Sequence, residues 1–279
     1  MDGHFRTFSF VDQITAAVPG AGIRGRFTVP ARVQSFPVAL VAEAVGQLAA
    51  WSAMAAVGFT HRPVAGIAGQ VKLISSVRPG QVLELEAELE SLDTESVGYC
   101  GSAYADGVQV AHLLDCVGPM LPTEDFDDPK ALRERFTLLS TGGAPAGVFD
   151  GVPALDLEPD GREESRSLRT VLHIPKDAGF FEDHFPRRPV FPGTLLMHAN
   201  LQTAAQLAAE VPAKNGAAWR PRIVSDVKLR TFISPGETLI LETKRTAHSE
   251  TSLEMRVESR IGQRLISSAE IEFVSEVKP

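Results

Sequence analysis

The stretch GFFEDHFPRRPVFPGTLLMH, residues 179–198, decides the fold and has two physically different parts. Three prolines within residues 186–192 fix φ repeatedly and push the residues before them out of the helical region. This pattern predicts a stiff loop that holds His184 in one place. After Pro192 the chain is apolar nearly all round, which predicts a buried helix starting near Gly193. The unpaired N–H groups of its first turn would face the loop, placing a base beside an oxyanion site.

The same residues resemble a known signature. His184–Pro186 followed by Phe191–Gly193 resembles the His-Phe-Pro…Phe-Pro-Gly motif of β-hydroxyacyl-acyl-carrier-protein dehydratases. The resemblance implies the hotdog fold, in which a curved antiparallel sheet wraps one long helix. The family motif carries a Glu or Asp fourteen positions after the loop histidine, where this chain has His198. The resemblance therefore implies that the missing acid lies elsewhere in the chain.

Composition and charge exclude several classes of protein. The 279 residues are 44% hydrophobic and 22% charged, as in a soluble globular protein, and the net charge of −8 argues against nucleic-acid binding. Cys100 and Cys116 are too few for a disulfide framework or a zinc site, and we expect neither a metal nor an organic cofactor. The N-terminus lacks the features of a signal peptide, and the most apolar stretch, residues 44–59, reads as too short to span a bilayer. We expect a cytoplasmic protein without a membrane segment.

The first half of the chain also predicts a helix followed by strands. Residues 37–57 form an apolar helix whose polar members Glu43 and Gln47 are four apart and share one face. Alternating residues predict strands at 23–29, 69–73, 82–89, 96–105 and 108–117, the last two joined by a hairpin turn at residues 106–107.

An internal repeat relates the two halves. Phe36-Pro37 recurs 155 residues later as Phe191-Pro192, and the same offset places Glu43 on His198 and Gln47 on Gln202. The run Val71–Leu73 recurs as Val227–Leu229. We therefore predict an α+β double hotdog: a first unit at 1–121, a linker at 122–147 and a second unit at 148–279. The tandem would be a pseudo-dimer within one chain, with further homo-oligomerisation open.

The repeat predicts one composite active site. In the family that the motif resembles, two hotdogs pair so that the loop histidine of one faces the helix acid of the other, which here brings His184 to Glu43. The reciprocal site lacks both groups, because His198 replaces the acid and only nine positions separate Thr28 from Pro37. That interval is too short for a histidine loop.

The resemblance implies dehydration of a 3-hydroxyacyl thioester to a trans-2-enoyl thioester. His184 would act as the base, and the Gly193 amide would polarise the thioester carbonyl. Glu43, with its pKa raised by apolar surroundings, would protonate the leaving hydroxyl. We further expect contacts with the substrate from Phe185, Val190, Pro192 and Gln47. Arg187 and Arg188 are either solvated charges or contacts for a phosphate or an acidic carrier protein.

The acyl group could be carried by acyl carrier protein or by coenzyme A, in fatty-acid or polyketide synthesis. Two other functions remain open at this point. A hotdog thioesterase would need Glu43 alone to activate water, and a degenerate tandem would bind acyl chains without catalysis. An isomerase activity would use the same residues as the dehydratase.

Overall fold

The computed structural model describes residues 5–146, 149–151, 154–213 and 217–276. Within them the strands form one 13-stranded antiparallel sheet in the order β1-β2-β5-β6-β7-β4-β10-β13-β12-β11-β9-β8, with β3 paired to β7. The first half contributes β1 (Gln13–Ala17), β2 (Gly22–Thr28), α1 (Val38–Ala56), β3 (His61–Pro63), β4 (Ile67–Leu73), β5 (Val82–Leu92), β6 (Ser96–Ala105) and β7 (Val108–Pro122). The second half contributes β8 (Asp156–Glu163), β9 (Ser167–His173), η2 (Gly179–Glu182), α3 (Gly193–Ala208), β10 (Ala218–Leu229), β11 (Thr238–His248), β12 (Ser252–Ile261) and β13 (Arg264–Glu276).

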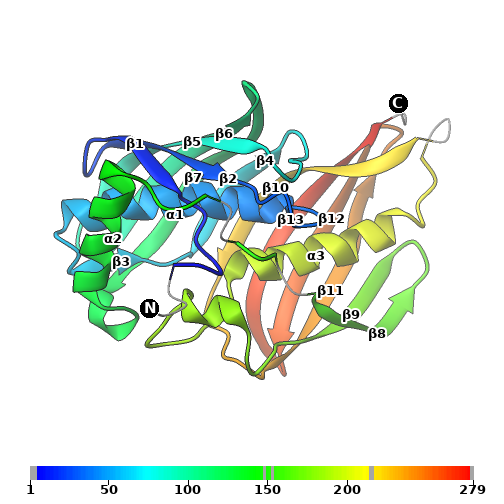
Figure 1. The fold of residues 1–279 in the computed structure, drawn as a ribbon. Coiled ribbons are helices and arrows are strands. Elements are labelled where there is room, and N and C mark those ends of the chain that lie inside the picture. Colours follow the sequence, from blue (N-terminus) through cyan, green and yellow to red (C-terminus); the bar gives the residue numbers. More distant parts are fainter. Residues whose placement is uncertain (1–4, 147–148, 152–153, 214–216, 277–279) are drawn as a thin grey trace.

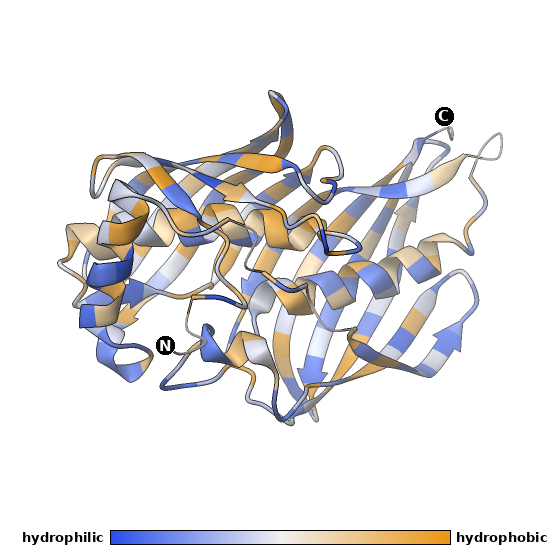
Figure 2. Cartoon of the chain, viewed as in Figure 1, coloured by the Kyte–Doolittle hydropathy of each residue, from blue (hydrophilic) through white to orange (hydrophobic). Residues whose placement is uncertain are grey.

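Each half of the sheet packs against its own long helix. Helix α1 contacts β2, β5, β6 and β7, and α3 contacts β9 to β13 (Figure 1). The strands alternate apolar and polar residues, which gives the sheet one face toward the helices and one toward solvent (Figure 2). The predicted helices and the hairpin turn are confirmed, and both turn residues, Asp106 and Gly107, have positive φ.

A proline with nearly the same backbone angles precedes each of the two long helices. Pro37 precedes α1 with φ −58° and ψ 139°, and Pro192 precedes α3 with φ −59° and ψ 131°. Neither helix has a side-chain N-cap, so proline alone sets the entry of the chain. The preceding loops differ in length. Residues 29–37 connect β2 to α1, whereas residues 174–192 connect β9 to α3 and include η2 and His184.

Helix α1 is longer than the apolar stretch that the sequence predicted at residues 44–59. It is 19 residues long with a mean hydropathy of 1.4, so its length and composition alone would suffice to cross a bilayer. Most of it is buried inside the protein, with Leu40, Val41, Val45 and Leu48 fully inaccessible. The apolar surface all round α1 is therefore accounted for by the sheet and by α3, which also contacts it.

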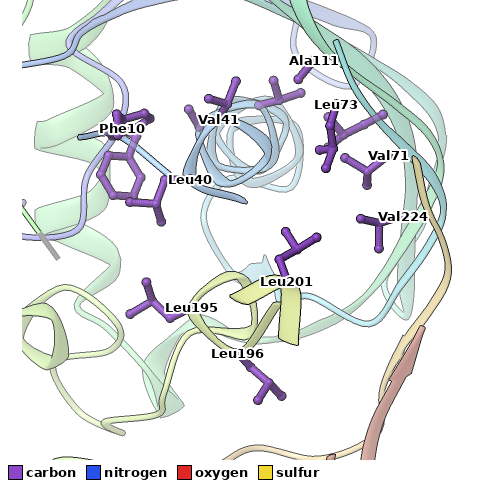
Figure 3. Close-up of a cluster of buried hydrophobic side chains, with 14 of the residues drawn as sticks. Phe10, Leu40, Val41, Val71, Leu73, Ala111, Leu195, Leu196, Leu201 and Val224 are labelled. Carbon is purple, nitrogen blue, oxygen red and sulfur yellow. The ribbon is translucent and has the colours of Figure 1, made fainter. Parts of the chain in front are cut away.

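The two halves meet at strands β4 and β10, which are equivalent in the sequence repeat. They pair antiparallel, with Val71 opposite Val224 and Gln70 opposite Ser225. The core is continuous across this junction. Figure 3 shows Leu201 of α3 in the space between the two helices, with Val71 and Val224 beside it.

In the predicted linker at 122–147, the structure describes residues 122–146, which contact both halves of the chain. They contain η1 (Thr123–Asp125) and α2 (Pro129–Thr141). Asp128 caps α2 by accepting a hydrogen bond from the Lys130 N–H at 3.1 Å, and α2 contacts β1 and α1. Phe126 and Asp127, just before α2, are almost completely buried, so this segment contributes to the interior.

Candidate active site

The loop between β9 and α3 holds the His184 imidazole by one ring nitrogen. Nδ1 lies 2.9 Å from the carbonyl oxygen of Val190, and the Val190 N–H donates back to the His184 carbonyl at 3.0 Å. A carbonyl accepts only, so Nδ1 carries the proton and Nε2 is left as the basic atom. The Phe185 ring stacks on the imidazole with centroids 4.1 Å apart and planes inclined by 24°. The loop therefore fixes both the tautomer and the orientation of His184.

The electrostatic surroundings of His184 favour its neutral form. Burial lowers the pKa of His184 below the usual 6.5, and the charge of Arg62 acts in the same direction. The carboxylate of Glu43 opposes this by favouring the imidazolium, but burial is the largest influence on this pKa. At neutral pH the imidazole is thus available as a base.

Glu43, on α1, is held by one hydrogen bond from each half of the chain. Its Oε2 accepts from Thr194 Oγ1 at 2.7 Å, and its Oε1 accepts from Gln47 Nε2 at 2.9 Å. Thr194 lies in the first turn of α3, directly after the loop that carries His184. The Thr194–Glu43 contact therefore links the start of the second helix to the acid on the first.

Gln47 holds Glu43 from the N-terminal side of the site. Besides Glu43, its Nε2 donates to the Phe8 carbonyl at 2.9 Å, and its Oε1 accepts from the Phe10 N–H at 2.8 Å. These contacts occupy both hydrogens of its amide. Gln47, expected to contact the substrate, lies on the cavity described below, and in this structure its polar atoms bond to the protein.

Gly193 starts α3 and supplies a free backbone donor. As the first residue of the helix, its N–H has no intrahelical acceptor. A Cβ at this position would have to displace Cδ1 of Leu229, so the close packing of α3 on β10 favours glycine. Its amide can therefore serve as one donor of an oxyanion hole.

These groups line one cavity of about 820 Å³. Its walls come from α1, β3, β4, β6 and β7 of the first half and from the histidine loop, the start of α3 and the end of β10 in the second, and they are mostly apolar. Of the predicted site residues, those on the cavity are Glu43, Gln47, His184, Phe185, Val190 and Gly193. Pro192 is buried at the start of α3 and is not part of the lining.

The two predicted docking arginines lie outside the cavity lining. Arg187 is exposed and donates to the Glu124 carbonyl at 3.0 Å, and the Arg188 guanidinium lies 4.6 Å from the centre of the Phe232 ring. The arginines that do line the cavity are Arg62, Arg135 and Arg230. Binding by Arg187 and Arg188 stays a prediction.

The equivalent positions of the second helix do not form a second site. His198 is partly buried, and burial lowers its pKa, but within the described ranges it has no hydrogen-bond partner and does not line the cavity. Gln202 is exposed, and Ala39 stands on α1 where α3 has Thr194. The polar cluster around Glu43 is therefore absent from its counterpart.

Sequence reasoning missed three contributors to the site. Thr194 was hidden because its partner lies 151 residues away. Asp183, next to His184 in the motif, accepts hydrogen bonds from the backbone N–H groups of Phe5, of Thr7 at 2.8 Å and of Phe8 at 2.6 Å. It thereby ties the N-terminal segment to the histidine loop. Arg62, the third, gave no signal in the sequence beyond being one charge on a short strand.

Comparison with known proteins agrees with this arrangement. The ApeI-like family, described as ApeI dehydratase, matches residues 160–269, which include the histidine loop and α3. Among solved structures, a putative oleoyl thioesterase from Lactobacillus plantarum has a TM-score of 0.60 at 10% identity, covering 93% of this chain and 98% of its own. The 12:0-ACP thioesterase of Umbellularia californica has a TM-score of 0.52 at 10% identity, covering 91% and 94%. These solved structures share the fold of this chain over nearly its whole length.

The curated relatives that the chain matches include dehydratases. The chain is 34% identical over 90 residues to the 3-hydroxyacyl-(acyl-carrier-protein) dehydratase FabZ of Roseiflexus sp. (strain RS-1), a match covering 32% of this chain and 59% of that enzyme. It is 27% identical over 111 residues to FabZ of Tolumonas auensis, covering 39% and 74%. The first of these matches spans little more than half of the relative's length.

Proposed function

We propose that this protein is a double hotdog that dehydrates 3-hydroxyacyl thioesters carried by acyl carrier protein, giving trans-2-enoyl thioesters. The observation that carries the proposal is the shared cavity on which His184 of the second half and Glu43 of the first both lie. The two groups come from opposite halves of the chain, and two titratable side chains on one mostly apolar cavity are typical of a catalytic site.

Two further observations support the double-hotdog arrangement. The equivalent prolines Pro37 and Pro192 start the two long helices with nearly the same backbone angles. The equivalent strands β4 and β10 pair antiparallel, as an approximate two-fold axis between them requires. We propose units at 1–121 and 148–279 connected by residues 122–147.

In the proposed reaction, His184 Nε2 removes the proton from C2 of the substrate. The C2–H electron pair forms the C2=C3 double bond as the C3–O bond breaks, with enolate character developing on the thioester oxygen. The Gly193 N–H donates to that oxygen and stabilises the charge. Glu43 gives its proton to the departing hydroxyl, which leaves as water. Proton transfer from the His184 imidazolium to Glu43 then restores the starting state.

The hydrogen bonds of Glu43 suit this role. A threonine hydroxyl can either donate or accept, so the contact with Thr194 persists whether or not Glu43 carries a proton. Gln47 holds the other carboxyl oxygen and keeps the group aimed into the cavity. The apolar walls exclude water, which strengthens each electrostatic contact during the reaction.

A thioesterase is the second candidate, favoured by the same fixed carboxylate. Glu43, held at both oxygens, could instead activate a water molecule to attack the thioester carbonyl. In that case His184 would not be needed. We place dehydration first because the imidazole is oriented through Nδ1 and stacked on Phe185. The thioesterase reaction described here would not need an oriented imidazole.

One assay separates the candidates. The purified protein is incubated with a short and a long 3-hydroxyacyl thioester, on acyl carrier protein and on coenzyme A. Absorbance of the conjugated enoyl thioester and release of free thiol are both followed. Enoyl product without thiol supports dehydration, and thiol release without enoyl product would replace that proposal with the thioesterase. Tight binding with neither product would indicate an acyl-binding protein. We propose a cytoplasmic location, which cell fractionation tests.

A further inference from the structure

Arg62 is a buried cation on the wall of the cavity. It lies on β3, its side chain is only 12% exposed, and its Nη1 lies 3.3 Å from Oδ2 of the buried Asp127. Burial lowers the pKa of Arg62 to about 10, with the carboxylates of Asp127 and Glu43 opposing the change. The guanidinium is therefore still charged at neutral pH.

The ion pair with Asp127 does not account for the placement of this arginine. Its Nε is buried and has no hydrogen-bond partner within the part of the chain that the structure describes. An arginine placed to anchor a carboxylate would use two parallel N–H donors. Here one pairs with Asp127, while the centre of the guanidinium lies 3.9 Å from the centre of the Phe185 ring.

Phe185 lies between Arg62 and His184. The imidazole stacks on the Phe185 ring at 4.1 Å, so it covers one face of that ring. The guanidinium, at a similar distance from the same centre, cannot share this face without colliding with the imidazole. The three groups therefore form a stack with Phe185 in the middle. Arg62 comes from the first half of the chain, and Phe185 and His184 come from the second.

We propose that Arg62 is a positioning residue for His184, holding the imidazole in its working orientation through Phe185 and placing a positive charge behind it. The inference rests on the proposed function only in taking His184 as the base. In this proposal each half positions the reactive group of the other half. Arg62 of the first half positions His184 of the second, and Thr194 of the second half holds Glu43 of the first.

The charges around His184 define what removal of Arg62 should do. Glu43 on α1 favours the imidazolium, Arg62 on β3 disfavours it, and the Val190 carbonyl accepts from Nδ1. Asp127, Arg135 and Arg230 line the same cavity. Among the other charged groups of the loop, Asp183 binds backbone N–H groups of the N-terminal segment and the two loop arginines contact residues 124, 126 and 232.

The test measures the titration of His184 by NMR in Arg62→Met, without any substrate. We expect the midpoint to move up by about one pH unit, because a positive charge that opposed protonation is gone. Asp127→Asn and the Arg62→Met/Asp127→Asn double variant separate this effect from the effect of removing the arginine from the Asp127 carboxylate. The midpoint should remain higher in the double variant than in Asp127→Asn alone.

Arg188→Met is the matched control, because Arg188 also lies over aromatic rings of this region but outside the cavity lining. It should leave the midpoint unchanged. Arg62→Lys keeps the charge and loses the planar stack, so it should preserve the midpoint while lowering kcat about tenfold with KM nearly constant.

An unchanged midpoint in Arg62→Met and in the double variant would overturn the proposal. So would an equal shift in Arg188→Met. If Arg62→Met does not fold, the double variant and Arg62→Lys decide, because the first also removes the Asp127 carboxylate and the second keeps a positive charge beside it. The titration is independent of turnover. Absence of any enoyl product would therefore count against the dehydratase alone, and an unmoved midpoint against the role of Arg62 alone.

Discussion

Thr194 Oγ1 donates to Glu43 Oε2 at 2.7 Å, and this bond joins the first turn of α3 to the second turn of α1. It makes the orientation of the acid depend on the docking of the two halves. The same turn of α3 begins with Gly193, the proposed oxyanion donor. In the proposed reaction this turn therefore supplies the donor to the thioester oxygen and also holds the acid that protonates the hydroxyl at C3.

Replacing Thr194 should weaken catalysis without affecting folding. Thr194→Val keeps the shape and removes the donor, so we expect kcat to fall roughly tenfold because Glu43 loses one of its two supports. Thr194→Ser should restore most of the rate. Steady-state kinetics on an acyl-carrier-protein substrate measures this, and full activity in Thr194→Val would show that the contact is dispensable.

His184 and Glu43 should behave as one unit. His184→Ala and Glu43→Gln should each lower kcat by roughly 10²-fold or more, because each removes one proton-transfer step. The double variant should be little slower than the slower single variant. Multiplicative losses would mean that the residues act independently. A Glu43→Gln variant that loses thiol release while His184→Ala keeps it would support the thioesterase.

His198 should be dispensable for turnover. It occupies the acid's position on α3 but does not line the cavity, so His198→Ala should keep kcat within about twofold of the wild type. Thermal unfolding checks that the variant is folded. A large loss of kcat in a folded His198→Ala protein would contradict the single composite site.

The acid limb of the pH profile should reflect the lowered pKa of His184. The base must be neutral, so protonation of His184 should lower kcat/KM on the acid side of the profile, with a midpoint below 6.5. Glu43→Gln removes the carboxylate that favours the imidazolium, and its residual activity should show this limb at still lower pH. A limb above 6.5 in the wild type would contradict the base assignment.

The length of the acyl chain should be limited by the first helix. Ala50 on α1 lines the cavity, whereas Ala205 at the equivalent position of α3 is exposed. Ala50→Leu should reduce kcat/KM for a long 3-hydroxyacyl thioester about tenfold more than for a short one, because the larger side chain fills cavity space. Ala205→Leu should leave the ratio unchanged, and equal ratios in both variants would place the acyl chain elsewhere.

The sequence by itself predicted the main elements and the two residues that we propose to react. Proline spacing predicted the loop of His184, apolar periodicity predicted both long helices, and the repeat offset singled out Glu43 as the acid that His198 could not supply. These signals are local or periodic, so they can be detected in the sequence without knowledge of the fold. The repeat also predicted that residues 29–37 leave no room for a second histidine loop.

Only the tertiary structure decided which side chains support that pair. Thr194, Arg62 and Asp127 lie far from their partners in the sequence, and each is an ordinary residue of its own strand, helix or turn. The pairing of β4 with β10 and the packing of α1 on α3 bring them to one cavity, where Asp127 forms an ion pair with Arg62. Such contacts depend on the geometry of the assembled sheet, which no local pattern of residues encodes.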